Sequence, residues 1–196
     1  TLLKKDLKKV KFNFLNDSKV LDFPFRWNNK DWERLWQFNL HYFEWARDIV
    51  ELSLVKNKPA KDLKLIEPLI DSWIDYNPIG HGDGWHSYTL SLRIRNWIWL
   101  FRTFPHLKNL KRITSLWHQI IWLYKHKEKC HGGNHYLENL ISLIIGSLQF
   151  ENSYGEKIYT NSLTLLKREL KNQILIDGGH QERSAAYHIL ILDRLI

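Results

Sequence analysis

The chain has 196 residues, 44% of them hydrophobic and 26% charged, which is long enough for one buried core and too polar on average for an integral membrane protein. Lys and Arg outnumber Asp and Glu by 29 to 21, giving a formal net charge of +8. This charge favours an anionic partner, either nucleic acid, an acidic membrane or an acidic polysaccharide, and does not choose among them.

The predicted elements are two short strands followed by helices. Strand-forming residues are concentrated at Val10–Phe14 and Val20–Phe25, and beyond them apolar residues recur at helical spacing. A helix capped by Asp31 or Asn29 is expected at about 31–57. Six more are expected at about 61–76, 87–104, 109–128, 135–150, 156–175 and 181–196. They are separated by breakers at Pro59, Asn77-Pro78, Pro105, Gly132-Gly133, Gly155 and Gly178-Gly179, and Pro68 is expected to kink the second helix.

Seven helices of similar length with short connections predict an all-α protein built from antiparallel helix pairs, either stacked as a solenoid or curved into a toroid. We place a lead segment of irregular structure or short strands at 1–26 and a helical domain at 27–196. The chain begins with Thr1, contains no methionine, and ends in a helical pattern without a stop signal. We therefore expect a fragment of a longer protein. Most of the ten tryptophans are expected to fill space between helices.

A first motif follows the helix predicted at 109–128 and carries an amide, an imidazole and a carboxylate in one short run, His131-Gly-Gly-Asn134-His135-Tyr-Leu-Glu138. If a helix begins near Asn134, then Asn134, His135 and Glu138 share one face of its first turns and can bind a carboxylate. Alternatively, Asn134 is only an N-cap and His135 an exposed first-turn residue. This motif alone does not decide between the two.

A second motif has the same design, a Gly-Gly pair followed by ionisable residues: Asp177-Gly-Gly-His180-Gln-Glu182-Arg183-Ser-Ala-Ala-Tyr187-His188. On a helix, Arg183 and Tyr187 would be one turn apart. A phenol with a pKa of about 10 is a poor base until a nearby positive charge lowers that pKa. Alternatively, Glu182 and Arg183 are surface charges and Tyr187 is a core ring, although the two similar motifs then need separate explanations.

Both motifs resemble those of the heparinase II/III family of polysaccharide lyases. Two upstream segments, Trp36–Tyr42 and Gly84–Trp97, are similar to the N-terminal helical region of that family. The resemblance extends from about residue 27 onward and implies an incomplete α/α toroid. In the family a β-sandwich domain follows this toroid, and that domain is absent from this chain.

The resemblance implies β-elimination at a uronic acid. Asn134 would neutralise the uronate carboxylate, His135 and Glu138 would support it, and Tyr187 would act as general acid, with general base as a second role. His180, Glu182 and Arg183 would form a supporting shell. The substrate groove would be lined by His86, Tyr88, Arg93, Arg95 and Asn96, with Trp85 and Trp36 as stacking platforms. The family's further catalytic histidine comes from beyond this chain, so we expect these residues alone to be weakly active or inactive.

Two other classes of function are compatible with parts of the sequence. A metal site at Cys130, His131 and His135, with His81 and His86 nearby, fits no standard zinc spacing, and HExxH is absent; no metal or cofactor is expected. A non-catalytic binding module for acidic polysaccharide remains the alternative. Nucleic acid is not expected, because the basic residues are dispersed or gathered at Lys4–Lys11. No membrane insertion is expected. Bacterial origin and a periplasmic or secreted location agree with the family, and the uronate polymer stays open.

Overall fold

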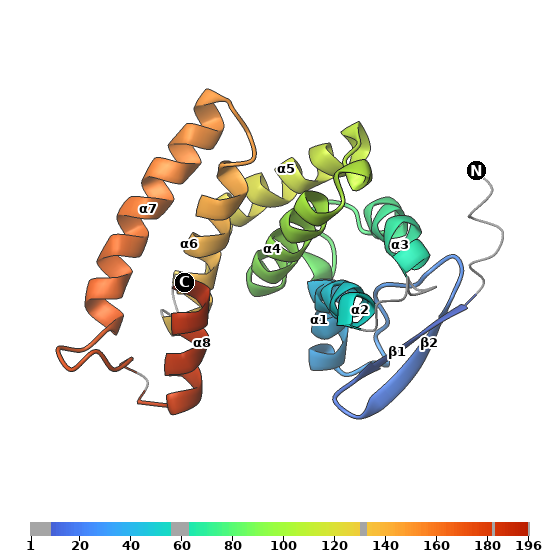
Figure 1. Cartoon of the computed structure of the whole chain (residues 1–196), viewed down its shortest axis with the longest axis horizontal. Helices are drawn as coiled ribbons and strands as arrows, with labels where there is room; N and C mark the ends of the chain where they lie inside the picture. Colours follow the sequence, from blue (N-terminus) through green and yellow to red (C-terminus); the bar gives the residue numbers. More distant parts are fainter. Residues whose placement is uncertain (1–8, 56–62, 130–132, 182, 196) are drawn as a thin grey trace. The chain divides into compact units, whose positions relative to one another are not determined.

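The computed structural model describes residues 9–55, 63–129, 133–181 and 183–195 (Figure 1). These residues divide into two compact parts, one ending at Gln119 and one beginning at Ile120, which we call the N-terminal part and the C-terminal part. The expected breaker Pro59, the candidate metal ligands Cys130 and His131, and Glu182 lie outside the described residues.

The N-terminal part contains β1 (Lys9–Phe14), β2 (Asp17–Asp22), α1 (Arg34–Tyr42), α2 (Glu44–Val55), α3 (Leu63–Tyr76), the short 3-10 helix η2 (Asp83–Trp85), α4 (Ser87–Thr103), the 3-10 helix η3 (Pro105–Leu107) and most of α5 (Leu110–Lys125). The C-terminal part contains the end of α5, then α6 (Gly133–Ser147), α7 (Ser153–Gln173) and α8 (Ala185–Leu195).

Strands β1 and β2 form an antiparallel hairpin, with Lys9 opposite Asp22 and Phe14 opposite Asp17. Its two-residue turn has φ values of 55° at Leu15 and 61° at Asn16, as in the turns that match the twist of paired strands. The first strand lies where it was expected. The second begins three residues earlier than expected, because this tight turn brings the chain straight back into the ladder.

The single helix expected at 31–57 is wrong, since the chain breaks at Phe43 into α1 and α2. Phe43 has a left-handed φ of 61° and is fully buried. Its ring stacks on Trp27 with centroids 5.6 Å apart and meets the ring of Trp97 edge-on at 5.4 Å. Aromatic packing of this size outweighs the cost of one left-handed residue. The residue preceding α1 is Glu33, so neither of the two expected caps is used.

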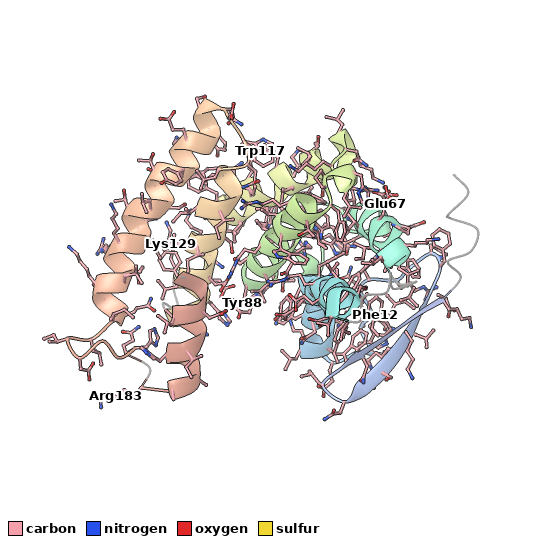
Figure 2. All side chains as sticks on the ribbon, viewed as in Figure 1. Phe12, Glu67, Tyr88, Trp117, Lys129 and Arg183 are labelled. Carbon is pink, nitrogen blue, oxygen red and sulfur yellow. The ribbon has the colours of Figure 1, made fainter. Side chains whose placement is uncertain are left out.

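Large rings fill the core of the N-terminal part, as expected. Four tryptophans there are almost completely buried: Trp27, Trp36, Trp73 and Trp97. Trp73 is central, because its ring lies 5.9 Å from that of Trp85 and 5.5 Å from that of Trp97. Phe12 of β1, labelled in Figure 2, attaches the hairpin to this core through an edge contact with Trp45 at 5.1 Å.

In the C-terminal part, α6 packs against α7 and α8. Their shared core consists of Tyr136, Leu137, Leu140, Ile141, Leu166 and Ile191. Helix α7 begins at Ser153, earlier than expected, because the Asn152 side chain accepts a hydrogen bond from the Gly155 N–H at 2.8 Å. Gly155 is therefore not a breaker. It lies in the first turn, where an added Cβ would come within 2.8 Å of the Phe150 carbonyl oxygen.

Pro68 lies inside α3, and the expected kink there stays a prediction. Helix α8 begins at Ala185, four residues later than expected, because the residues before it form a turn. Within the described ranges, no helix is both long and apolar enough to cross a membrane.

Candidate functional site

The first motif opens helix α6, as expected. Gly133 is its first residue and has a φ of +67°, a conformation that glycine adopts without strain. Asn134 and His135 follow in the first turn and are partly exposed. Glu138, one turn further along, is only 4% exposed, and its Oε1 accepts a hydrogen bond from the Ser142 hydroxyl at 3.5 Å. Asn134 and His135 are thus the residues of the three that a ligand can reach.

His135 is paired with Glu128, which was not among the residues singled out from the sequence. His135 Nδ1 lies 3.0 Å from Glu128 Oε2, and the two side chains are 45% and 17% exposed. Glu128 is held in turn by its backbone N–H, which donates to Asn139 Oδ1 at 2.9 Å. A carboxylate on Nδ1 keeps a proton on that nitrogen and orients the ring. The only sequence signal for this pair was an acidic residue shortly before the first motif.

The first part of the second motif forms a turn, and only its last residues, from Ala185 on, begin a helix. An isolated antiparallel bridge joins Ile174 to His180, and the Leu175 N–H donates to the Gly179 carbonyl at 2.8 Å. Gly178 has a φ of +83°, which explains a glycine there. Asp177 Oδ1 accepts from the Gly179 N–H at 2.9 Å, a common way for Asp to close a turn.

Arg183 lies in the loop before α8 (Figure 2) and is exposed, with a left-handed φ of 51°. Its backbone N–H donates to the His180 backbone carbonyl at 2.9 Å. Because Arg183 is outside the helix, the expectation that it shares a helix face with Tyr187 is wrong. Tyr187 itself lies in the first turns of α8, one turn before Ile191, whose buried side chain packs with α6. The structure describes the backbone of Tyr187 and not its side chain.

A buried glutamine joins the two motifs. Gln173, at the end of α7, is 1% exposed, and its Oε1 lies 3.0 Å from Nε2 of His180, which is 2% exposed. Its Nε2 donates to the carbonyl oxygen of Gly133 at 3.3 Å. The second motif is therefore connected through one side chain to the peptide that precedes Asn134. Gln173 was not predicted, because its partners lie up to 40 residues away in the sequence.

Three of the expected groove residues in the N-terminal part are partly exposed: His86, Tyr88 and Arg95. His86 precedes the first residue of α4, and its ring lies 5.1 Å from that of Phe38. Tyr88, in the first turn of α4 (Figure 2), meets Tyr42 edge-on at 6.1 Å. These side chains keep surface that a ligand could contact.

The other expected groove residues are core residues, which corrects the expectation for them. Arg93 is 0% exposed and lies over the Trp73 ring, with its guanidinium carbon 3.8 Å from the ring centroid. The Asn96 amide donates to the Tyr42 carbonyl at 2.8 Å. The expected stacking platforms are 5% and 1% exposed, with their indole N–H groups bonded to backbone carbonyls: Trp85 to Asn77 and Trp36 to Asp17. None of these offers a face to a sugar.

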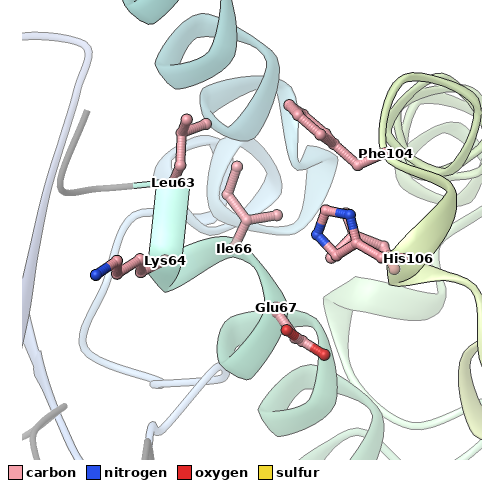
Figure 3. Close-up of a pocket in the computed structure, with 7 residues that line it drawn as sticks. Leu63, Lys64, Ile66, Glu67, Phe104 and His106 are labelled. Atoms are coloured by element: carbon pink, nitrogen blue, oxygen red, sulfur yellow. The ribbon is translucent and has the colours of Figure 1, made fainter. Parts of the chain in front are cut away.

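A pocket of about 420 Å³ lies in the N-terminal part between the start of α3 and η3 (Figure 3). Its lining is apolar with a charged rim and consists of Leu63, Lys64, Ile66, Glu67, Phe104, His106 and Leu107. Glu67 is already paired with Arg112 at 2.8 Å. No residue of either motif lines this pocket, so we do not assign the chemistry to it.

No group of three His, Cys, Asp or Glu side chains that could hold a metal ion occurs among the described residues. Of the metal ligands considered from the sequence, His81, His86 and His135 are within that part of the chain. His135 is engaged by Glu128 at 3.0 Å, so its Nδ1 has a carboxylate partner from the protein itself.

Comparisons with known proteins agree with the motifs. The family model described as Heparinase II/III N-terminus matches residues 2–196. A crystal structure of a mutant of the heparan sulfate lyase HepC from Pedobacter heparinus is similar with a TM-score of 0.72 at 18% identity, covering 98% of this chain and 32% of that one. The heparinase III BT4657 gene product, with methylated lysines, is similar with a TM-score of 0.74 at 16% identity, covering 98% and 34%.

No curated protein matches the chain. The chain spans about a third of the length of the two solved structures to which it is similar. The expected fold class, an all-α incomplete α/α toroid, is confirmed by these comparisons.

Proposed function

The chain belongs to the heparinase II/III family, and we propose that the protein containing it is a polysaccharide lyase acting on an acidic, uronic-acid-containing polymer by β-elimination. In this reaction a base removes the proton on C5 of the uronate, the bond from C4 to the glycosidic oxygen breaks, and a double bond forms between C4 and C5. The leaving oxygen takes a proton from an acid, and no water is added.

The main electrostatic obstacle is the uronate carboxylate beside C5. While it keeps its charge, the C5 proton is very weakly acidic, and the enolate-like transition state carries additional negative charge. Preorganised hydrogen-bond donors that neutralise this group lower the barrier. We assign this role to the Asn134 amide, in the partly exposed first turn of α6, with His135 beside it. Glu128 supports the assignment by holding the His135 ring at 3.0 Å.

The observation that carries the proposal is the connection of the two motifs through Gln173. A lyase needs a carboxylate-binding group and a proton-transferring group on one sugar, and the proposed pair is Asn134 and Tyr187. The bonds from Gln173 to Gly133 and to His180, together with the packing of α8 on α6, support their action in one site. We assign Tyr187 as general acid, with general base as a second role.

The remaining residues of the second motif are given supporting roles. We propose that His180 is a structural member of the turn and that exposed Arg183 attracts the anionic chain. His86, Tyr88 and Arg95, which are partly exposed, are proposed polymer contacts of the N-terminal part. The formal net charge of +8 supports an acidic substrate.

The test uses the complete protein with heparan sulfate, alginate, hyaluronan and a bacterial uronate-containing capsule. Cleavage by β-elimination is followed by the ultraviolet absorbance of the unsaturated product. Asn134→Ala should lower kcat by about 100- to 1000-fold, the typical loss when one preorganised donor is removed. Tyr187→Phe should also abolish most of the turnover.

Asn172→Ala is the matched control, because Asn172 is an exposed amide on α7 outside both motifs, and its activity should equal that of the wild type. Saturated reducing ends instead of unsaturated products would mean hydrolysis and would refute the proposal. Binding of a polymer without any cleavage by the wild type would favour the alternative, a non-catalytic binding module.

A further inference from the structure

Both the oxygen and the nitrogen of the Gln173 side-chain amide are hydrogen-bonded within the C-terminal part. The residue ends α7 and is 1% exposed. Its Oε1 lies 3.0 Å from His180 Nε2, and its Nε2 lies 3.3 Å from the Gly133 carbonyl oxygen and 3.1 Å from Glu169 Oε2. Its backbone carbonyl also accepts from the Gln181 N–H at 2.7 Å. One residue therefore contacts both motifs and the preceding turn of its own helix.

The partners fix which way the amide points. Gly133 O and Glu169 Oε2 are both acceptors, so the group facing them must be the NH₂, because a carbonyl there would face two oxygens. The amide oxygen consequently faces His180. A carbonyl oxygen accepts only, so Nε2 of His180 must carry a proton. The neutral ring then has its proton on Nε2 and none on Nδ1.

The other bond acts on the first motif. Gly133 O belongs to the peptide that joins Gly133 to Asn134, and holding that oxygen fixes the plane of the peptide from which Asn134 continues. The same amide therefore sets both the tautomer of His180 and the orientation of the backbone at Asn134. Misplacement of a substrate-binding group by about 1 Å can cost roughly 100-fold in rate.

We infer that Gln173 is a positioning residue of the lyase site, which locks the second motif against the backbone of the first. This inference rests on the proposed function for its catalytic consequence, and on geometry alone for the lock itself. It explains why glutamine occupies position 173. Glutamate would place a carboxylate against Gly133 O and the Glu169 carboxylate, and an apolar side chain would leave His180 Nε2 without its acceptor.

The experiment compares Gln173→Met and Gln173→Glu with Asn172→Asp in the complete protein. Methionine keeps the length of the side chain and removes all three of its hydrogen bonds. Asn172→Asp adds the same charge as Gln173→Glu at the exposed neighbouring position, so it controls for a general charge effect. The ring ¹⁵N resonances of His180, measured with histidine-selective labelling, report the tautomer directly and do not depend on activity.

In the wild type we expect one protonated nitrogen, Nε2, and one unprotonated nitrogen, Nδ1. In Gln173→Met the two resonances should move toward each other as the tautomers exchange. In that variant kcat should fall roughly 10- to 100-fold with KM changed less than about threefold, while Asn172→Asp stays at the wild-type values. Gln173→Glu keeps a polar side chain of the same length, and its kcat should also fall. A loss in both variants would show that the effect of methionine is not caused by altered packing alone.

Unchanged His180 resonances in both Gln173 variants would overturn the lock. Altered resonances with a wild-type kcat would overturn the positioning role, because Gln173 would then serve only the local fold. If the wild-type protein cleaves no uronate polymer, the proposed function fails, and the resonances still decide whether Gln173 holds His180 in one tautomer.

Discussion

Acidification from pH 7 to pH 5 should destabilise the N-terminal part through one buried histidine. His41 is 0% exposed, and its Nδ1 accepts the indole N–H of Trp73 at 2.9 Å. Burial, followed by the charge of Arg93, lowers the pKa of His41 from 6.5 to about 3, and a backbone contact at Trp27 offsets only part of this. A second ring proton would have to sit on Nδ1 and face the indole N–H.

The sign and size of the effect follow from proton linkage. In the unfolded chain His41 takes up a proton near pH 6.5, whereas in the folded chain it stays neutral down to about pH 3. Its contribution to stability is therefore complete above pH 6.5 and is lost as the pH falls between 6.5 and about 3. Over the interval from pH 7 to pH 5 the loss is about 2 kcal/mol of unfolding free energy.

Urea unfolding followed by tryptophan fluorescence measures this loss where it occurs, because only Trp122 of the ten tryptophans lies after Gln119. His41→Asn removes the titrating ring and keeps a side-chain oxygen for the Trp73 N–H. The variant should be less stable at pH 7 and should lose little further stability at pH 5. His118→Asn, at an exposed position of α5, is the control and should show the wild-type loss. The same loss in His41→Asn as in the wild type would refute the reasoning.

Three further predictions concern single residues. Gly84→Ala should lower the unfolding free energy by about 1 to 3 kcal/mol, because its Cβ would lie 2.9 Å from His41 Nδ1; unchanged urea unfolding would contradict the crowding. Arg112→Met should cost about 1 to 3 kcal/mol, since the buried guanidinium binds both carboxylate oxygens of Asp71 at 2.8 Å; a midpoint equal to that of the wild type would show that this pair is not stabilising. Burial lowers the pKa of Lys127 to about 8, so more of this amine is uncharged and reactive at pH 8. Limited acylation at that pH should modify Lys127 before exposed Lys129, as read by mass spectrometry, and the reverse order would contradict the lowered pKa.

Local patterns were sufficient for much of the fold and failed where distant residues decide. The helical spacing and the β1 strand were predicted, as was the start of α6 at the first motif. The break at Phe43 was not predictable, because nothing near it in the sequence interrupts the helical pattern. The break depends on Trp27, whose ring stacks on Phe43, and on Trp97, whose ring meets it edge-on, and both come from distant segments.

The same limit applies to the site. Arg93 was expected in the groove because it lies on a helix rich in tryptophan and carries a positive charge that suits an acidic polymer. In the structure its guanidinium instead lies over the face of the Trp73 ring, and its Nε donates to the side-chain oxygen of Gln119 at 2.8 Å. Both partners come from other helices. Gln173 and Glu128 were missed for the complementary reason. Each is an ordinary polar residue outside the motifs, and its role is visible only once its partners are brought next to it.

The contacts of Glu128 have a practical consequence for mutagenesis of the first motif. Glu128 contacts α6 twice, through His135 and through Asn139, although it precedes that helix in the sequence. A set of variants restricted to the motif residues would therefore omit a carboxylate that contacts two positions of the helix on which the motif lies.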